Sequence, residues 1–158
     1  MKIHTLERQQ TLPIPPDVAW AFYANPHNLL SVYPPAMKVQ LEGNPPKEVY
    51  PGLIMIIRAR VGGFLPVQMV QEVTQIEKPT QNKPGLFVDE QRFGPFKFFH
   101  HQHHFKPTQH GTQVTDLVLY ALPVGFAGDI AHGLFVRRQL ESMFDMKEKA
   151  VIEYFGEP

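Results

Sequence analysis

The chain has 158 residues, no cysteine, and 15 basic side chains against 15 acidic ones, so its formal net charge is zero. This length suffices for one hydrophobic core, and we expect a single domain over residues 1–158. The lack of cysteine excludes disulfides, cysteine–zinc sites and thiol nucleophiles, and the zero net charge provides no general attraction to nucleic acid.

The N-terminal part of the chain predicts a strand followed by two short helices. Alternating apolar residues over 3–14 indicate the strand, which ends in the prolines of 13–16. Pro15–Pro16–Asp17 then predicts a helix start, because proline fits the first turn and an acid favours the positive end of the helix dipole. Asn25–Pro26 repeats this signal for a second short helix, which stops at Tyr33–Pro34–Pro35.

The middle of the chain predicts antiparallel strands, since its apolar residues alternate with a period of two. The expected strands span 37–41, 53–61, 64–76, 86–93, 96–105 and 113–122, and turns rich in glycine and proline separate them. Most connections have hairpin length, so sequential strands should pair antiparallel.

Residues 126–155 predict one long helix. The segment contains no proline, and Phe135, Leu140, Phe144 and Val151 recur at close to helical spacing. An apolar stripe this wide must be covered, so the helix should lie across the sheet. The expected fold is therefore α+β, with a curved antiparallel sheet of about seven strands around the long C-terminal helix and a partly hollow interior between them.

No apolar stretch reaches the length of a membrane span. The best candidate, 53–61, is short and contains Arg58 and Arg60, whereas a spanning helix needs about 20 apolar residues. The first ten residues are polar and do not have the pattern of a secretory signal. We expect a cytoplasmic protein with no integral membrane segment.

The most unusual polar feature of the sequence is a group of four histidines in the predicted strand 96–105. They are His100, His101, His103 and His104. Residues two apart share one face of a strand, so His101 and His103 should lie together. Counting back from the next turn places His103 opposite 115–116, within reach of Asp116. This group is either a structural hydrogen-bonded cluster or the polar lining of a cavity with acid–base capability. Two histidines and Asp116 could also chelate a metal, but we expect no metal and no cofactor.

Methionine and aromatic side chains are candidates for lining an apolar cavity, because methionine is flexible and aromatic rings bury large areas. Ordinary core packing is the alternative for each residue. Arg58 and Arg60 should face solvent, while Arg92 is a candidate for orienting a polar group. The expected ligand-binding residues are Met55, Met69, Phe87, Arg92, Phe99, His101, His103, Phe135 and Met143.

The order of the elements and the residues at their joints resemble the START-like, polyketide cyclase/dehydrase-like (SRPBCC, helix-grip) superfamily. The matching stretches span essentially the whole chain: LPIPPDVAWAF (12–22), NPHNL (25–29), PG (51–52), FGPF (93–96), HQHHF (101–105) and TDLVLYALP (115–123). The resemblance implies a hydrophobic cavity between the sheet and the long helix. It does not imply an enzyme, since this fold hosts carriers and receptors as well as cyclases.

We therefore expect binding, for transport or sequestration, of a small hydrophobic ligand that is lipid-like or aromatic. The alternative is a cyclase, dehydratase or isomerase for a polyketide-like substrate, with His101 or His103 as the acid–base group and Asp116 as its partner. A third hypothesis is a protein-interaction module that uses the apolar helix face or a sheet edge. The partners considered are a small ligand and a second copy of the chain in a homodimer, not nucleic acid.

Overall fold

The computed structural model describes residues 2–123 and 129–157. The strands are β1 (His4–Leu12), β2 (Gln40–Leu41), β3 (Ile54–Val61), β4 (Leu65–Glu77), β5 (Gly85–Phe93), β6 (Phe98–Thr108) and β7 (Gly111–Ala121). The helices are α1 (Pro16–Tyr23), α2 (Leu29–Val32) and α3 (Asp129–Phe155), with short 3-10 turns at Pro26–Asn28 and Pro35–Met37. None of the described helices is long and apolar enough to cross a membrane.

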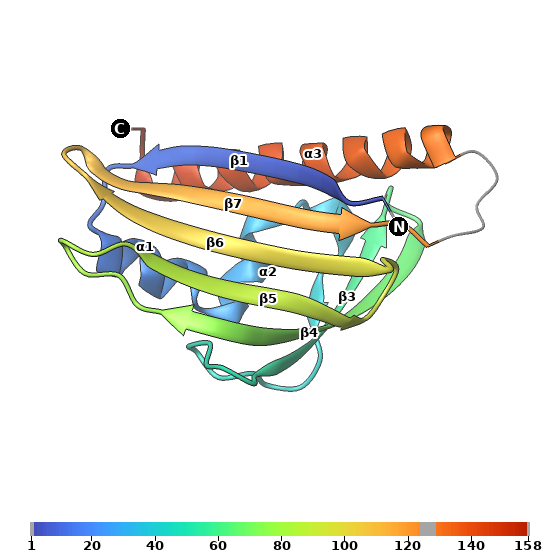
Figure 1. The fold of residues 1–158 in the computed structure, drawn as a ribbon, viewed down its shortest axis with the longest axis horizontal. Coiled ribbons are helices and arrows are strands. Elements are labelled where there is room, and N and C mark those ends of the chain that lie inside the picture. Colours follow the sequence, from blue (N-terminus) through green and yellow to red (C-terminus); the bar gives the residue numbers. More distant parts are fainter. Residues whose placement is uncertain (1, 124–128, 158) are drawn as a thin grey trace.

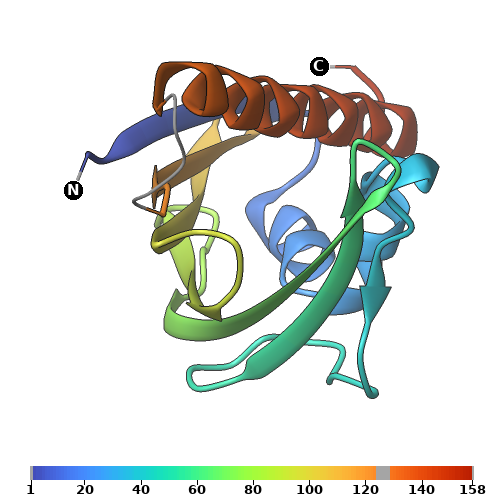
Figure 2. The same cartoon turned by 90° about the vertical axis from the view of Figure 1, so that its right-hand side faces the viewer.

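The strands form one antiparallel sheet in the order β1-β7-β6-β5-β4-β3-β2 (Figure 1). Seen end-on, the sheet curves beneath α3, and α1 and α2 lie inside the curve (Figure 2). Helix α3 contacts β1 and α2, so it closes the open side of the curved sheet. This arrangement confirms the predicted α+β helix-grip fold.

Most predicted strands match the structure to within three residues at each end, but one is much shorter than expected. The strand expected over 37–41 is reduced to Gln40–Leu41, because Pro35–Met37 forms a 3-10 turn and Lys38 has a left-handed φ of 45°. Adjacent prolines fix φ and remove backbone donors, which favours a turn over a paired strand. The expected start of the long helix at Phe126 lies outside the described residues, and the described helix begins at Asp129.

The interior contains two apolar clusters that follow one another along the strands and along α3. On β6, Phe99 belongs to one cluster and Phe105 to the other. On α3, Phe144 and Val151 are divided in the same way. The side chains between these positions therefore form a separate layer, and that layer is polar.

Candidate functional site

Five buried ionisable side chains lie between the two apolar clusters. They are Asp89 on β5, His101 and His103 on β6, Asp116 on β7, and Lys147 on α3, and each is less than 9% exposed. Buried charges are strongly unfavourable unless they are paired and hydrogen-bonded. The contacts within this group, here called the polar cluster, therefore determine its charge state.

Strand register brings the two histidines between the two carboxylates. Asp89 is opposite His101 in the β5–β6 pair, and Asp116 is opposite His103 in the β6–β7 pair. His101 and His103 share the inward face, as the period of two predicts. The expected placement of His103 opposite Asp116 is confirmed.

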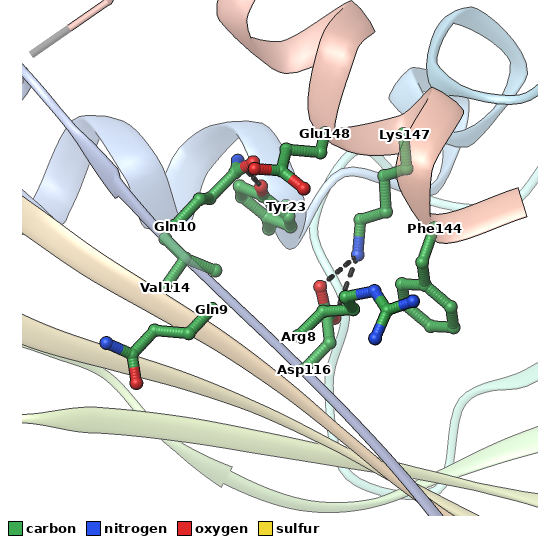
Figure 3. A pocket seen from close by; sticks show the side chains of 9 residues that line it. All are labelled: Arg8, Gln9, Gln10, Tyr23, Val114, Asp116, Phe144, Lys147 and Glu148. Carbon is green, nitrogen blue, oxygen red and sulfur yellow. Dashed lines mark hydrogen bonds and ion pairs between the residues drawn. The ribbon is translucent and has the colours of Figure 1, made fainter. Parts of the chain in front are cut away.

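On one side of the polar cluster, Asp116 accepts hydrogen bonds from two elements. Lys147 Nζ lies 2.8 Å from both carboxylate oxygens of Asp116 (Figure 3). His101 Nε2 is 3.0 Å from Asp116 Oδ1. His103 Nδ1 is 2.9 Å from the same oxygen, but the angle does not make a hydrogen bond, and this buried nitrogen has no other partner among the described residues.

On the other side, Asp89 is held by a histidine and an amide. His103 Nε2 is 2.9 Å from Asp89 Oδ2, and Gln71 Nε2 donates to Asp89 Oδ1 at 2.8 Å. His101 Nδ1 faces Asp89 Oδ2 at 3.7 Å, beyond hydrogen-bond distance. Both carboxylates thus contact both imidazole rings.

Burial and neighbouring charges shift the pKa values of the two carboxylates and the two imidazoles. Burial alone would raise the pKa of Asp116 and of Asp89, but Lys147 and the two imidazoles outweigh it and lower both values. For His103, burial opposes protonation, but the two neighbouring carboxylates outweigh it and raise its pKa. Burial and the charge of His103 lower the pKa of His101. The neighbouring charges therefore favour the ionised form of both carboxylates and make His103 easier to protonate than His101.

The two buried rings are therefore expected to titrate on opposite sides of the ordinary histidine pKa of about 6.5. An NMR titration of the imidazole signals should show His103 protonated at a pH where His101 is neutral. Because its folded pKa is raised, His103 stabilises the fold fully below the unfolded pKa, and this contribution is lost as pH rises through its folded pKa. His104, half-buried on the outer face, is the internal reference, since burial and the charge of His103 lower its pKa. Titration of His103 below His104 would contradict the proposed charge state.

A cavity of about 160 Å³ adjoins the polar cluster. Asp89, His101, His103 and Lys147 form its polar end, together with Gln71. Methionine, aromatic and aliphatic side chains form most of the remaining wall: Phe22, Val32, Met37, Val39, Val49, Met55, Ile57, Ala59, Met69, Phe87, Phe96, Phe99, Leu140, Met143 and Phe144. Tyr23, Asn25, Asn28 and Tyr33 also line the cavity. The space therefore suits a mainly apolar molecule with a few polar atoms.

The structure brings most of the predicted ligand-binding residues to this cavity. Those that line it are Met55, Met69, Phe87, Phe99, His101, His103 and Met143. It does not bring Arg92 or Phe135 there. Arg92 forms ion pairs with Glu72 and Glu90 on the outer face, and Phe135 is 49% exposed on α3.

Asp116 lies behind the histidines and does not line this cavity. Together with Lys147 it borders a separate hollow of about 10 Å³ (Figure 3), which is close to the minimum space for one water molecule. Its contacts indicate that Asp116 orients and neutralises other members of the polar cluster.

Sequence reasoning missed Asp89 and Lys147 as site residues, although each carries a usable signal. Asp89 is two residues after Phe87 on the same strand, so the two side chains share the inward face. Lys147 is three residues after Phe144 and four before Val151, within the apolar stripe of α3. A charged residue at an inward-facing position is the signal in both cases.

Comparisons with known proteins identify the family and the fold. Residues 4–150 match the family model described as polyketide cyclase / dehydrase and lipid transport. A search of the curated proteins finds no match to the sequence.

Solved structures share the fold at low identity. Major latex-like protein 151 from ginseng (Panax ginseng) has a TM-score of 0.68 at 14% identity, with 97% of each chain covered. A norcoclaurine synthase point mutant from Thalictrum flavum, in complex with a transition state analogue, has a TM-score of 0.64 at 18% identity, covering 97% of this chain and 96% of that one. A protein from Thermus thermophilus has a TM-score of 0.64 at 17% identity, covering 96% of this chain and 99% of that one.

Proposed function

Because this chain belongs to the polyketide cyclase / dehydrase and lipid transport family, we propose that it binds one small, mainly apolar ligand in the cavity between the sheet and α3. The observation that carries the proposal is a largely apolar cavity whose polar end consists of buried, mutually paired charges. A core that serves only stability is close-packed and leaves no cavity of this kind. It also gains little from charged groups that have been removed from water.

The volume of the cavity suits a ligand whose apolar part consists of one or two rings or has a similar volume. An engineered apolar cavity of about 150 Å³ in another protein accepts benzene, and the cavity here is about 160 Å³. The walls supply Met55, Met69 and Met143, whose flexible side chains adapt to different apolar shapes. Apolar burial therefore provides most of the binding free energy.

The polar end of the cavity sets the orientation of the ligand. Lys147 Nζ carries three N–H groups and directs two of them to Asp116, so one remains to donate to a ligand. Tyr33 adds a hydroxyl donor, because burial and the charges of Asp89 and Asp116 raise its pKa and keep it protonated. A ligand with one hydroxyl, carbonyl or carboxylate oxygen satisfies this end. The transition state analogue bound by the related norcoclaurine synthase supports the proposal that this fold encloses a small organic molecule.

Calorimetric titration with 2-naphthol, which has two rings and one hydroxyl, tests the proposal. We expect one saturable site. Naphthalene fills the same volume without a polar atom, so it should bind about tenfold more weakly, corresponding to one hydrogen bond of about 1.4 kcal/mol. Native mass spectrometry of the freshly purified protein provides a second readout, namely a co-purified small molecule that is released on unfolding. The absence of a saturable site for both probes, together with no co-purified molecule, would refute the proposal.

A further inference from the structure

The polar cluster contains a set of atoms with the chemistry of a metal site. Asp89, His101 and His103 each place one ligand atom within 4.8 Å of the other two. Asp89 Oδ2 is 2.9 Å from His103 Nε2 and 3.7 Å from His101 Nδ1. Metal–ligand bonds of about 2.0–2.2 Å separate neighbouring ligand atoms by about 3.0–3.4 Å. We propose that Asp89, His101 and His103 bind one divalent first-row transition-metal ion at the polar end of the cavity.

Asp116 occupies the position that supports such a site from behind. Its Oδ1 atom is 3.0 Å from His101 Nε2 and 2.9 Å from His103 Nδ1. These are the ring nitrogens that do not face Asp89. Ligating histidines generally direct their second nitrogen to a carboxylate or carbonyl group, which fixes the tautomer. The buried His103 Nδ1, which has no hydrogen-bond partner among the described residues, lies on this side of the ring.

Lys147 explains why Asp89 rather than Asp116 is the carboxylate ligand. Lys147 Nζ contacts both oxygens of Asp116 and neutralises that carboxylate. The sequence-based ligand set used Asp116, and the structure replaces it with Asp89, whose contacts in the described chain are to Gln71 and the two imidazoles. When both imidazoles are neutral, one nitrogen lone pair from each ring and the Asp89 carboxylate point toward the same place. These electron-rich groups repel one another, and a cation bound between them removes that repulsion.

The ligand set also indicates the class of metal. Two imidazoles and one carboxylate suit zinc, iron, cobalt, nickel or copper better than magnesium or calcium, which prefer all-oxygen sites. Three protein ligands leave further positions open, as in catalytic rather than structural sites. Since His101, His103 and Asp89 line the cavity, an oxygen atom of a bound ligand can reach the ion. One carboxylate leaves a divalent ion with a net charge of +1, which favours an anionic oxygen.

Calorimetric titration of chelator-treated protein with Zn²⁺ tests the site. We expect one tight site whose affinity falls as pH is lowered, because metal binding requires neutral imidazole. Asp89→Asn should weaken binding at least about a hundredfold, the upper end of the loss seen for residues behind the ligands. His104→Gln is the matched control, since His104 lies on the same strand but faces outward and contacts Gln102. It should bind Zn²⁺ as the wild type does.

NMR spectroscopy of the wild-type protein tests the same site if the Asp89→Asn variant does not fold. Zn²⁺ should shift the NMR signals of the His101 and His103 imidazoles and leave those of His100 and His104 unchanged. Binding that persists in folded Asp89→Asn, shifts confined to the outward histidines, or no stoichiometric binding would each overturn the proposal. Binding of 2-naphthol in the presence of chelator is measured separately, so failure of the metal site is distinguishable from failure of the ligand site.

Discussion

Replacing Lys147 by methionine is expected to lower the free energy of unfolding by about 3–5 kcal/mol, the usual effect of removing one partner from a buried ion pair. The substitution keeps an apolar side chain of similar length in the α3 stripe but leaves Asp116 without its ammonium partner. It also removes the contacts of Nζ with the Tyr23 and Phe144 rings, whose centres lie 4.9 and 5.3 Å away. Urea-induced unfolding, followed by circular dichroism, measures the change.

Two further variants isolate the cause of this loss. Lys149→Met changes an exposed lysine on the same helix, and its effect should stay within about 0.5 kcal/mol. The double variant Lys147→Met/Asp116→Asn removes one positive and one negative charge, so the net charge of the polar cluster is unchanged. It should be more stable than Lys147→Met alone. A Lys147→Met variant as stable as Lys149→Met would show that the buried ion pair does not exist in solution.

Replacing Met143 by tryptophan is expected to weaken binding of 2-naphthol at least about tenfold. Met143 on α3 lines the cavity and packs against the apolar cluster that contains Phe99 and Phe144. An indole there occupies space that the ligand needs. Overpacking a core position generally lowers the free energy of unfolding by about 1–3 kcal/mol, so we expect the protein to remain folded.

Met146→Trp is the matched control for this experiment. Met146 is on the same helix but 38% exposed, and it does not line the cavity. The Met146→Trp variant should bind 2-naphthol with wild-type affinity in calorimetry. Equal affinities of the Met143→Trp and Met146→Trp variants would place the ligand outside the cavity.

Local sequence patterns predict which face of a strand each residue occupies, and the structure confirms these faces for β3. The alternation in β3 directs Met55 to the cavity and Arg58 and Arg60 to the outside. In β5 the same rule places Arg92 and Phe87 on opposite faces of the strand, because their positions differ by an odd number. Arg92 therefore lies on the outer face, where it pairs with Glu72 and Glu90, and the prediction that it orients a ligand is wrong.

Phe135 illustrates the same point for the helix. It precedes Leu140 by five residues, which rotates its side chain about 140° away at 3.6 residues per turn. The apolar stripe of Leu140, Phe144 and Val151 therefore excludes it, and the structure places it at the surface. Helical periodicity therefore predicts that Phe135 lies outside the apolar stripe.

The composition of the polar cluster could not be predicted in this way. His101 and His103 are recognisable within one strand, and the hairpin turn predicts that His103 faces Asp116. The contact of Lys147 with Asp116 depends on how far α3 is shifted along the sheet. The position of Asp89 depends on the register between β5 and β6, and the structure places four residues (94–97) between these strands where the predicted strands leave two. Both are properties of the assembled fold.

The central claim is that a ligand enters the space between the curved sheet and α3. Methionine methyl groups report on it directly, because Met37, Met55, Met69 and Met143 line the cavity and Met146 does not. In a protein labelled with ¹³C at the methionine methyls, we expect bound 2-naphthol to give intermolecular nuclear Overhauser effects to those four methyls and none to Met146. Contacts to Met146 alone, or saturable binding without contact to any of the four, would contradict the claim.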